Sequence, residues 1–357
     1  MLWYHSRLIL PADLRHEGNS FTALRWFLAS AVMVSHAWDL TQPQRGIDPT
    51  VALLSFPISH LAVLLFFTLS GFLVTGSLFK RGVIPFLQAR ALRLLPGLWV
   101  MLLVVPPLLW LAFGTIDWAT FAGSPETWRF LLRNAALLGK AYHLPGLFET
   151  HPLPGLVNGS LWTIPHEVRC YLVLAALAAV GLTQPRWLCT LVISAGLLVH
   201  MLLPGTTVDW FDGSRWLAFS FFIGVLAWLW RDILPLSWPL AVACVAVALL
   251  LPPGTFGKET LLQTAFAYLA LLIAFRIPES WKAMSARMPD YSYGIYIYAF
   301  PAQQAALAMG ATTPLANLGL AFAMTLPMAA LSWHLVEKPA LRFKTGKTLP
   351  EAATPHP

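Results

Sequence analysis

The sequence predicts an all-α polytopic membrane protein with about ten transmembrane helices. Of its 357 residues, 57% are hydrophobic and only 11% are charged, whereas a soluble domain carries about 25% charged residues. The 16 tryptophans are typical of chains whose indole rings lie at membrane interfaces. Ten stretches are apolar over about 20 residues, the length that crosses a bilayer. They are residues 22–40, 56–78, 94–113, 162–181, 187–203, 215–230, 236–252, 260–276, 291–309 and 315–335.

The distribution of basic residues predicts the orientation of these spans. With the N-terminus in the cytoplasm, most Lys and Arg residues fall in inside loops, as the positive-inside rule requires, and both termini are cytoplasmic. These loops explain the net charge of +7, so we expect a lipid bilayer and no nucleic acid as a partner. We expect residues 1–344 to form one membrane-embedded domain. The polar, Pro-containing residues 345–357 are expected to form a disordered tail.

Two connections differ from the short loops elsewhere. Residues 79–93 form a basic loop that we expect on the cytoplasmic side. The longest outer loop covers residues 114–161, and within it Ser124-Pro125-Glu126 is typical of a helix start. Residues 127–139 are too short and too charged to span a bilayer, which predicts a helix lying at the outer interface.

The first span contains two ionisable residues, Arg25 and His36, which are eleven residues apart. At about 100° and 1.5 Å per residue, both side chains lie on one helix face, about 16 Å apart. Ionisable groups inside a bilayer are costly and usually functional. Arg25 then lies at the cytoplasmic surface, and His36 lies in the outer half of the membrane, where a neutral imidazole can deprotonate a hydroxyl group. The structural alternative is a histidine hydrogen-bonded within the helix bundle.

A second acid–base candidate is Glu167, about 9 Å below the outer surface and so at a depth comparable to that of His36. A carboxylate there can orient the imidazole and stabilise its protonated form. The structural alternative is an ion pair with Arg169 or Arg215. No metal site is predicted, because His166-Glu167 is not followed by the histidine of a zinc-binding helix and the three cysteines lie in apolar runs.

Three further polar residues lie in or next to apolar spans. Ser70 precedes Gly71, and a Ser-Gly pair in a span often permits close helix packing. The alternatives to a packing role for Ser70 are a contact with the substrate and a role as a nucleophile. Arg90 and Arg93 are spaced three apart and therefore share a helix face. Guanidinium groups suit phosphate recognition, although basic residues at this position can also serve only to set the topology.

Taken together, these residues resemble the membrane acyltransferase-3 family over most of the chain, from Leu24 to Pro339. Each motif is weakly specific alone, but six in order within ten spans are specific together. Many members carry histidine where Ala299 stands, so we assign no acid–base role to that position. In chain order the motifs are Arg25 with His36, Phe66-Phe67-Thr-Leu-Ser70-Gly71-Phe72, Arg90-x-x-Arg93 with Pro96, Ser160-Leu-Trp162-Thr-Ile-Pro-His-Glu167-Val-Arg-Cys-Tyr171, Tyr291-Ser292-Tyr293-Gly294-Ile-Tyr296 and Val336-Glu337-Lys338-Pro339.

The resemblance implies a membrane-bound O-acyltransferase of the bacterial cytoplasmic (inner) membrane. Its donor would be acyl-CoA, with acetyl-CoA expected, and its acceptor a hydroxyl group of an extracytoplasmic sugar or polysaccharide. His36 would be the general base and Glu167 would orient it. Two further groups of residues complete the predicted site. They are Arg25, Arg90 and Arg93 near the phosphates of coenzyme A, and Ser70, Asn158, Trp162 and Tyr293, in or beside the motifs, in contact with the substrate.

Two other classes of protein fit part of the pattern. Ten spans with Arg, His and Glu inside the membrane also suit a proton-coupled transporter of a small molecule or glycan precursor. Against a transporter, the sequence shows no internal repeat and no pair of matching broken helices. A structural subunit of a polysaccharide export complex would have no need for the buried Arg25, His36 and Glu167.

Overall fold

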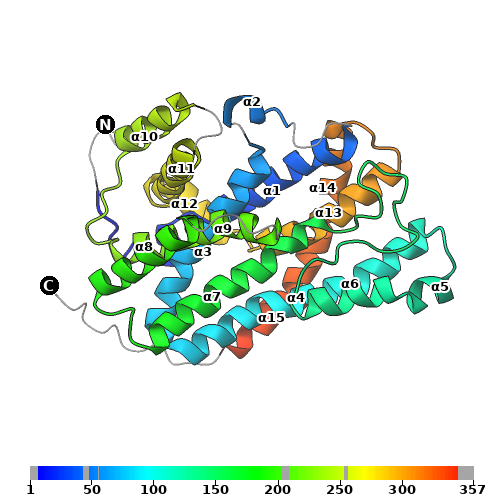
Figure 1. The fold of residues 1–357 in the computed structure, drawn as a ribbon, viewed down its shortest axis with the longest axis horizontal. Helices are drawn as coiled ribbons and strands as arrows, with labels where there is room; N and C mark the ends of the chain where they lie inside the picture. The colour runs from blue at the N-terminus through cyan, green and yellow to red at the C-terminus, as the bar shows by residue number, and fades with distance from the viewer. Residues whose placement is uncertain (1–6, 43–47, 55, 203–208, 253–255, 345–357) are drawn as a thin grey trace.

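The computed structural model of the protein describes residues 7–42, 48–54, 56–202, 209–252 and 256–344. Within these ranges the chain is helical, and its β pairing is limited to two isolated bridges. Each of the ten apolar stretches coincides with a helix (Figure 1). These helices are α1 (Phe21–Thr41), α3 (Ile58–Arg81), α4 (Val83–Phe113), α7 (Ile164–Ala179), α8 (Arg186–Leu202), α9 (Asp209–Leu229), α10 (Trp238–Leu250), α11 (Phe256–Arg276), α13 (Ser292–Ala308) and α14 (Pro314–Ser332).

Several of these helices are suited to a bilayer. Four helical segments of the described chain are long and apolar enough to cross a membrane: Ile58–Arg81, Val83–Phe113, Gly257–Arg276 and Pro314–Phe343. Large apolar side chains also face outward, such as Leu103 and Leu111 of α4, whose surfaces are 69% and 75% exposed. Such exposure is typical of side chains that face lipid. The protein is therefore an all-helical membrane protein; the predicted tail, residues 345–357, lies outside the described residues.

The basic segment 79–93 is helical and not a loop. Helix α3 continues to Arg81 and α4 begins at Val83, so that Gly82 alone connects them. Gly82 has a φ of +78°, a conformation that glycine adopts without the steric penalty of a side chain. Arg90 and Arg93 therefore project from the first turns of α4 and not from a loop.

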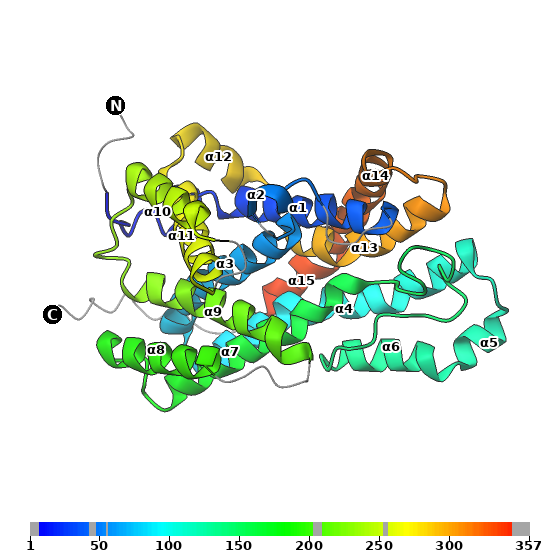
Figure 2. The ribbon, with the colours of Figure 1, turned by 45° about the horizontal axis from the view of Figure 1, so that its top comes forward.

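The outer connection contains the helix start that the sequence predicts. Helix α6 (Pro125–Ala135) begins after Ser124, whose Oγ accepts a hydrogen bond of 3.2 Å from the amide of Glu126. It ends four residues earlier than predicted, and α5 (Trp118–Gly123) precedes it. Figure 2 shows both helices at one end of the molecule, with α6 alongside α4. The remaining short elements are η1 (His16–Gly18), α2 (Val51–Leu54), η2 (Gly159–Thr163), α12 (Glu279–Arg287), the π-helical turn η3 (Trp333–Glu337), α15 (Lys338–Ala340) and η4 (Leu341–Phe343).

Helix α1 lies against α3 on one side and against α13 and α14 on the other (Figure 2). Helix α3 in turn packs closely on α9. A Cβ atom added to Gly71 would lie 2.0 Å from the Phe221 carbonyl oxygen, and one added to Gly224 would lie 2.0 Å from the Thr68 carbonyl oxygen. The close packing predicted for Ser70-Gly71 is thus confirmed at Gly71. The Ser70 hydroxyl group instead contacts side chains of α7.

Contacts between distant segments agree with the predicted alternation of membrane sides. In each case a hydrogen bond joins two segments that the sequence places on the same side. The pairs are Arg7 with Leu236, His16 with Ala286, Ser20 with Ala274 and Gln88 with Phe343 on the side of the termini, and His151 with Gln304 and Trp216 with Gln263 on the other.

Candidate active site

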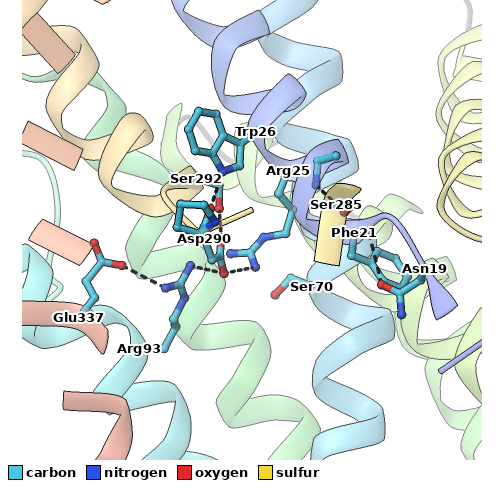
Figure 3. Close-up of polar contacts among 12 residues, drawn as sticks. Asn19, Phe21, Arg25, Trp26, Ser70, Arg93, Ser285, Asp290, Ser292 and Glu337 are labelled. Atoms are coloured by element: carbon cyan, nitrogen blue, oxygen red, sulfur yellow. Dashed lines mark hydrogen bonds and ion pairs between the residues drawn. The ribbon is translucent and has the colours of Figure 1, made fainter. Parts of the chain in front are cut away.

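A chain of ion pairs joins α1, α4 and the segments at the ends of α12 and α14. Asp290, in the turn before α13, lies between two arginines: its Oδ2 accepts from Arg25 Nη1 at 2.7 Å and from Arg93 Nη2 at 2.9 Å. Arg93 Nη1 donates to Glu337 Oε2 at 3.0 Å (Figure 3). Two cations and two carboxylates therefore alternate, so that neither Arg25 nor Arg93 is an unpaired charge.

The carboxylates of this network are held by hydroxyl groups. Ser292 Oγ donates to Asp290 Oδ1 at 2.7 Å, and Ser332 Oγ donates to Glu337 Oε1 at 2.9 Å. Burial alone would raise the pKa of the Asp290 carboxyl, but the charges of Arg25 and Arg93 outweigh it and hold this pKa below its usual range. Asp290 is thus ionised at neutral pH, and the arginines are fixed in place.

Ser70 and Glu167 form a second polar cluster together with Tyr171. Ser70 Oγ donates to Glu167 Oε1 at 3.0 Å and lies 2.9 Å from the Tyr171 hydroxyl group, which donates to the same carboxylate oxygen. Glu167 and Tyr171 are four residues apart on α7 and so lie on one face, opposite Ser70 on α3. The carboxylate thus orients two hydroxyl groups.

Members of both clusters line one cavity of about 120 Å³ between α1, α3, α4, α7 and α13, whereas the carboxylates of Asp290 and Glu337 do not. Its wall is otherwise largely apolar, with side chains such as Phe66 and Phe67. Six of the nine residues that the sequence analysis selected contribute to it, although they come from five helices. They are Arg25, Ser70, Arg90, Arg93, Glu167 and Tyr293.

Arg90 differs from the other two arginines because it forms no ion pair with any residue that the structure describes. Its Nε atom is buried and has no hydrogen-bond partner. The carboxylate of Glu167 and the hydroxyl group of Tyr171 are close enough to interact with its charge, but neither bonds to it. A buried, unsatisfied guanidinium N–H is costly, so Arg90 is the cavity's available donor for an anion or a carbonyl oxygen.

His36 lies outside the lining of this cavity. Its imidazole packs against Phe300 of α13, with ring centroids 5.1 Å apart, and its buried Nδ1 has no hydrogen-bond partner among the described residues. Glu167 bonds to Ser70 and Tyr171, and no hydrogen bond joins it to His36 in the described chain. The carboxylate that interacts with His36 is that of Asp39, three residues further along α1.

Of the three other residues selected from the sequence, Tyr293 lines the cavity and donates to the Leu94 carbonyl oxygen at 2.9 Å. Asn158 is fully buried, and its Nδ2 donates to the Ile297 carbonyl oxygen at 2.9 Å. Pro301, four residues after Ile297, lacks the N–H that would bond this carbonyl in a regular helix. Asn158 thus replaces a missing backbone donor.

Trp162 packs edge-on against His166, with ring centroids 5.7 Å apart, and does not line the cavity. Tyr171, Asp290 and Glu337 were not among the site residues predicted from the sequence. Tyr171 and Glu337 lie within the family motifs, and Asp290 directly precedes one of them. Position in or next to a motif was thus the feature of the sequence that could have identified these residues. No group of three or more His, Cys, Asp or Glu residues in the described ranges is arranged to hold a metal ion.

Lys344 adds to the positive charge at the end of α4 that carries Arg90. Burial lowers the pKa of the Lys344 amine to about 8, and the charges of Arg90, Arg93 and Arg81 act in the same direction. The Gln88 side chain holds this segment on α4 by donating to the Phe343 carbonyl oxygen at 3.4 Å. Several cations are thus concentrated at one end of the cavity.

We expect the Lys344 amine to react with acylating reagents at a lower pH than the exposed Lys80. With a pKa of about 8, about half of the Lys344 amines are neutral and nucleophilic at pH 8. Mass spectrometry of labelled peptides across a pH series measures the midpoint. The substitution Arg90→Gln removes a neighbouring positive charge and should raise that midpoint; the same midpoint in the variant would contradict the proximity of the two cations.

The fold and this cavity define a helical membrane protein with a charged internal site, and comparison with known proteins identifies its class. Residues 19–336 match the model of the Acyl_transf_3 family, described as an acyltransferase domain. The chain belongs to this acyltransferase family, as its motifs predicted.

Two relatives align over nearly their full length. The O-acetyl transferase of Shigella phage Sf6 is 26% identical over 347 residues, which cover 92% of this chain and 97% of the relative. Nodulation protein 10 of Rhizobium leguminosarum bv. viciae is 27% identical over 371 aligned positions, covering 94% and 97% respectively. No solved structure matches the chain at a significant level.

Proposed function

We propose that the protein is an O-acyltransferase that moves an acetyl group from acetyl-CoA to a hydroxyl group of an extracytoplasmic sugar or polysaccharide. Membership of the acyltransferase family supports the transfer reaction. The name of the Sf6 relative, an O-acetyl transferase, supports acetyl as the group and oxygen as its acceptor. No comparable observation favours the transporter alternative.

The observation that carries this proposal is the single cavity shared by three arginines and the Ser70–Glu167–Tyr171 cluster. The donor has an anionic nucleotide and a neutral thioester. Arg90, with its unsatisfied buried Nε, suits the anionic part or the thioester carbonyl oxygen. The apolar wall at Phe66 and Phe67 suits a small acyl group.

In this reaction His36 acts as the general base, which requires the acetyl end of the donor to reach beyond the cavity, because His36 is not part of the cavity lining. Its neutral imidazole removes the proton of the acceptor hydroxyl group while the hydroxyl oxygen attacks the thioester carbonyl carbon. The carbon–sulfur bond then breaks, and the leaving thiolate takes up the proton from the imidazolium. Glu167 holds Ser70 and Tyr171 in position; to orient His36 directly, it would have to leave these two donors when substrate binds.

We place the arginine end of the cavity on the cytoplasmic side of a bacterial inner membrane, where acetyl-CoA is made. His36 lies eleven residues further along α1, about 16 Å closer to the opposite side. This separation allows the donor to enter from one side and the acceptor from the other.

The proposal is tested with purified protein in lipid nanodiscs, radiolabelled acetyl-CoA and candidate glycans. We expect label to appear on a glycan, and mass spectrometry should find an acetyl ester that mild base removes. If the protein binds acetyl-CoA but labels none of the host's surface glycans, the proposed acceptor class is wrong. If it neither binds acetyl-CoA nor hydrolyses its thioester, the donor is wrong.

We expect Arg90→Gln to weaken acetyl-CoA binding by about tenfold, since one charge-assisted hydrogen bond to the donor is lost. Isothermal titration of the protein in nanodiscs measures this dissociation constant. Arg81→Gln is the matched control, because Arg81 belongs to the same basic segment but lines no part of the cavity. Equal affinities of the two variants would show that Arg90 only adds to the local positive charge.

A further inference from the structure

A larger groove opens beside the cavity, on the side of the molecule where the first residues of α1 meet α12 and η3. Its volume is about 760 Å³, and Arg25 and Leu73 line both it and the cavity. The two spaces therefore meet at these two side chains. We call this space the outer groove because it lies outside the cavity; it is on the side of the termini, and the name does not refer to the outer side of the membrane.

The size of the cavity requires a second space for the donor. A site for a drug-sized ligand has a volume of about 300–1,000 Å³. The cavity, at about 120 Å³, has room for an acyl group and the end of a pantetheine arm, but not for a nucleotide. The outer groove is of sufficient size and adjoins the cavity, so a ligand that begins in one can continue into the other.

The charges of the outer groove suit phosphate groups. Arg287 at the end of α12 and Lys338 at the start of α15 are both exposed, and neither forms an ion pair with a described residue. His16 and His334 line the same groove and are held in place: His16 Nε2 donates to the Ala286 carbonyl oxygen at 3.1 Å, and His334 Nε2 lies 2.8 Å from the Tyr291 hydroxyl group. The groove thus presents Arg, Lys and His side chains from three separate segments, which are η1, α12 and the continuous η3 and α15.

The carboxylate of the outer groove does not cancel this positive charge. Asp290 lines the groove, but its Oδ2 already accepts from Arg25 and Arg93. Trp333 lines the groove too and is half-buried. An indole face of this kind suits stacking on a purine base.

We propose, resting on the function proposed above, that the outer groove binds the nucleotide half of acyl-CoA. Arg287 and Lys338 contact its 3′-phosphate, and Trp333 contacts its adenine. The pantetheine arm passes Arg25 and Leu73 into the cavity. From the sequence, the CoA phosphates were expected near Arg25, Arg90 and Arg93. In this assignment only Arg25 lies between the nucleotide and the thioester, and Arg93 is a fixed member of the ion-pair network.

The test compares CoA with dephospho-CoA, which lacks only the 3′-phosphate. Titrations use the full chain in phosphatidylcholine nanodiscs, with the wild type and the double variant Arg287→Gln, Lys338→Gln. We expect the double variant to bind CoA about tenfold more weakly and dephospho-CoA nearly as the wild type does, because two exposed charge contacts to one phosphate are lost. The ratio of the two dissociation constants should fall toward one, which general damage to the fold would not produce.

Arg342→Gln is the matched control, because Arg342 is exposed in the adjoining η4 but does not line the groove; it should bind both ligands as the wild type does. A lipid phosphate offers the same chemistry as the nucleotide, so nanodiscs containing phosphatidylglycerol form a second arm. Two results together would overturn the proposal and assign the groove to lipid. Phosphatidylglycerol would compete with CoA in the wild type but not in the double variant, and the substitutions would leave the affinity for CoA unchanged.

Two further outcomes separate this assignment from the proposed function. If the wild type binds CoA and the double variant keeps the full preference for CoA over dephospho-CoA, the groove assignment alone is wrong. If the wild type binds neither ligand in any lipid, the proposed donor is wrong, and the groove assignment fails with it.

Discussion

The substitution His36→Ala is expected to reduce acetyl transfer by about 10²- to 10⁴-fold, the contribution typical of a general base. Without the imidazole, the acceptor hydroxyl group has no base to remove its proton. The protein should remain folded, since His36 Nδ1 makes no hydrogen bond within the described chain and its removal therefore leaves no hydrogen-bond partner of that atom unsatisfied. Transfer to the glycan is measured under single-turnover conditions, and thermal unfolding of the same sample reports on the fold.

A matched control keeps this result specific to His36. His60 lies near the start of α3, at the same end of the bundle as His36, and contacts only Phe56 among aromatic rings of the described chain. His60→Ala should therefore transfer acetyl groups as the wild type does. If His36→Ala is equally active, the base is another group and the mechanism is wrong. If binding of acetyl-CoA is lost together with transfer, His36 contributes to the donor site instead.

The helices were predictable because their apolar stretches are long and their ends carry local signals. Ser124 is an example: a side chain that caps a helix acts on residues two or three positions away, so the sequence contains both partners. The segment 79–93 was not predictable in the same way. A cluster of basic residues is compatible with a loop or with a helix, and the positive φ of Gly82 that joins two helices directly is a property of the folded chain.

The cavity was predictable in its members but not in their partners. Helical periodicity gives the face of a side chain within its own helix, but it does not explain why Arg25, predicted at the cytoplasmic surface, and Glu167, predicted near the outer surface, line one cavity. It does not give the rotation of one helix relative to another. Glu167 was therefore predicted beside His36, but α7 turns it toward Ser70 on α3.

The ion-pair network was missed for a related reason. Asp290 and Glu337 come from segments far from α1 and α4 in the sequence, and nothing local indicates that they pair with Arg25 and Arg93. The need for such partners was nevertheless predictable in physical terms, because a buried arginine without a carboxylate is strongly unfavourable. A search for acidic residues at the same membrane depth would have selected both carboxylates.

The second large effect is expected for Asp290→Asn, which should lower the free energy of unfolding by about 2–4 kcal/mol. Breaking a buried pair costs about 3–5 kcal/mol, and we lower this range because the side chains of Arg25 and Asp290 are 25% and 22% exposed. The amide keeps the shape of the carboxyl group but leaves Arg25 and Arg93 as neighbouring positive charges. Unfolding in mixed micelles with increasing denaturing detergent measures the change.

The pH of this measurement matters because the pKa of Asp290 is lower in the folded protein than its ordinary value, which is about 3.9 in an unfolded chain. A carboxyl group of this kind stabilises the fold fully above about pH 4, and its contribution declines as the pH falls further toward the folded pKa. A measurement at pH 7 therefore captures the whole effect, and the difference between wild type and Asp290→Asn should shrink in strong acid.

Two comparisons decide whether the network is responsible. Asp232→Asn removes a carboxylate from the exposed pair with Arg186 and should cost less than about 1 kcal/mol. The double variant Asp290→Asn, Arg25→Gln removes one charge of each sign and should recover part of the loss, because Arg93 keeps Glu337 as its partner. If Asp290→Asn costs no more than Asp232→Asn, and Arg25→Gln restores nothing, the four charges act as independent surface groups and do not hold the arginines of the cavity in place.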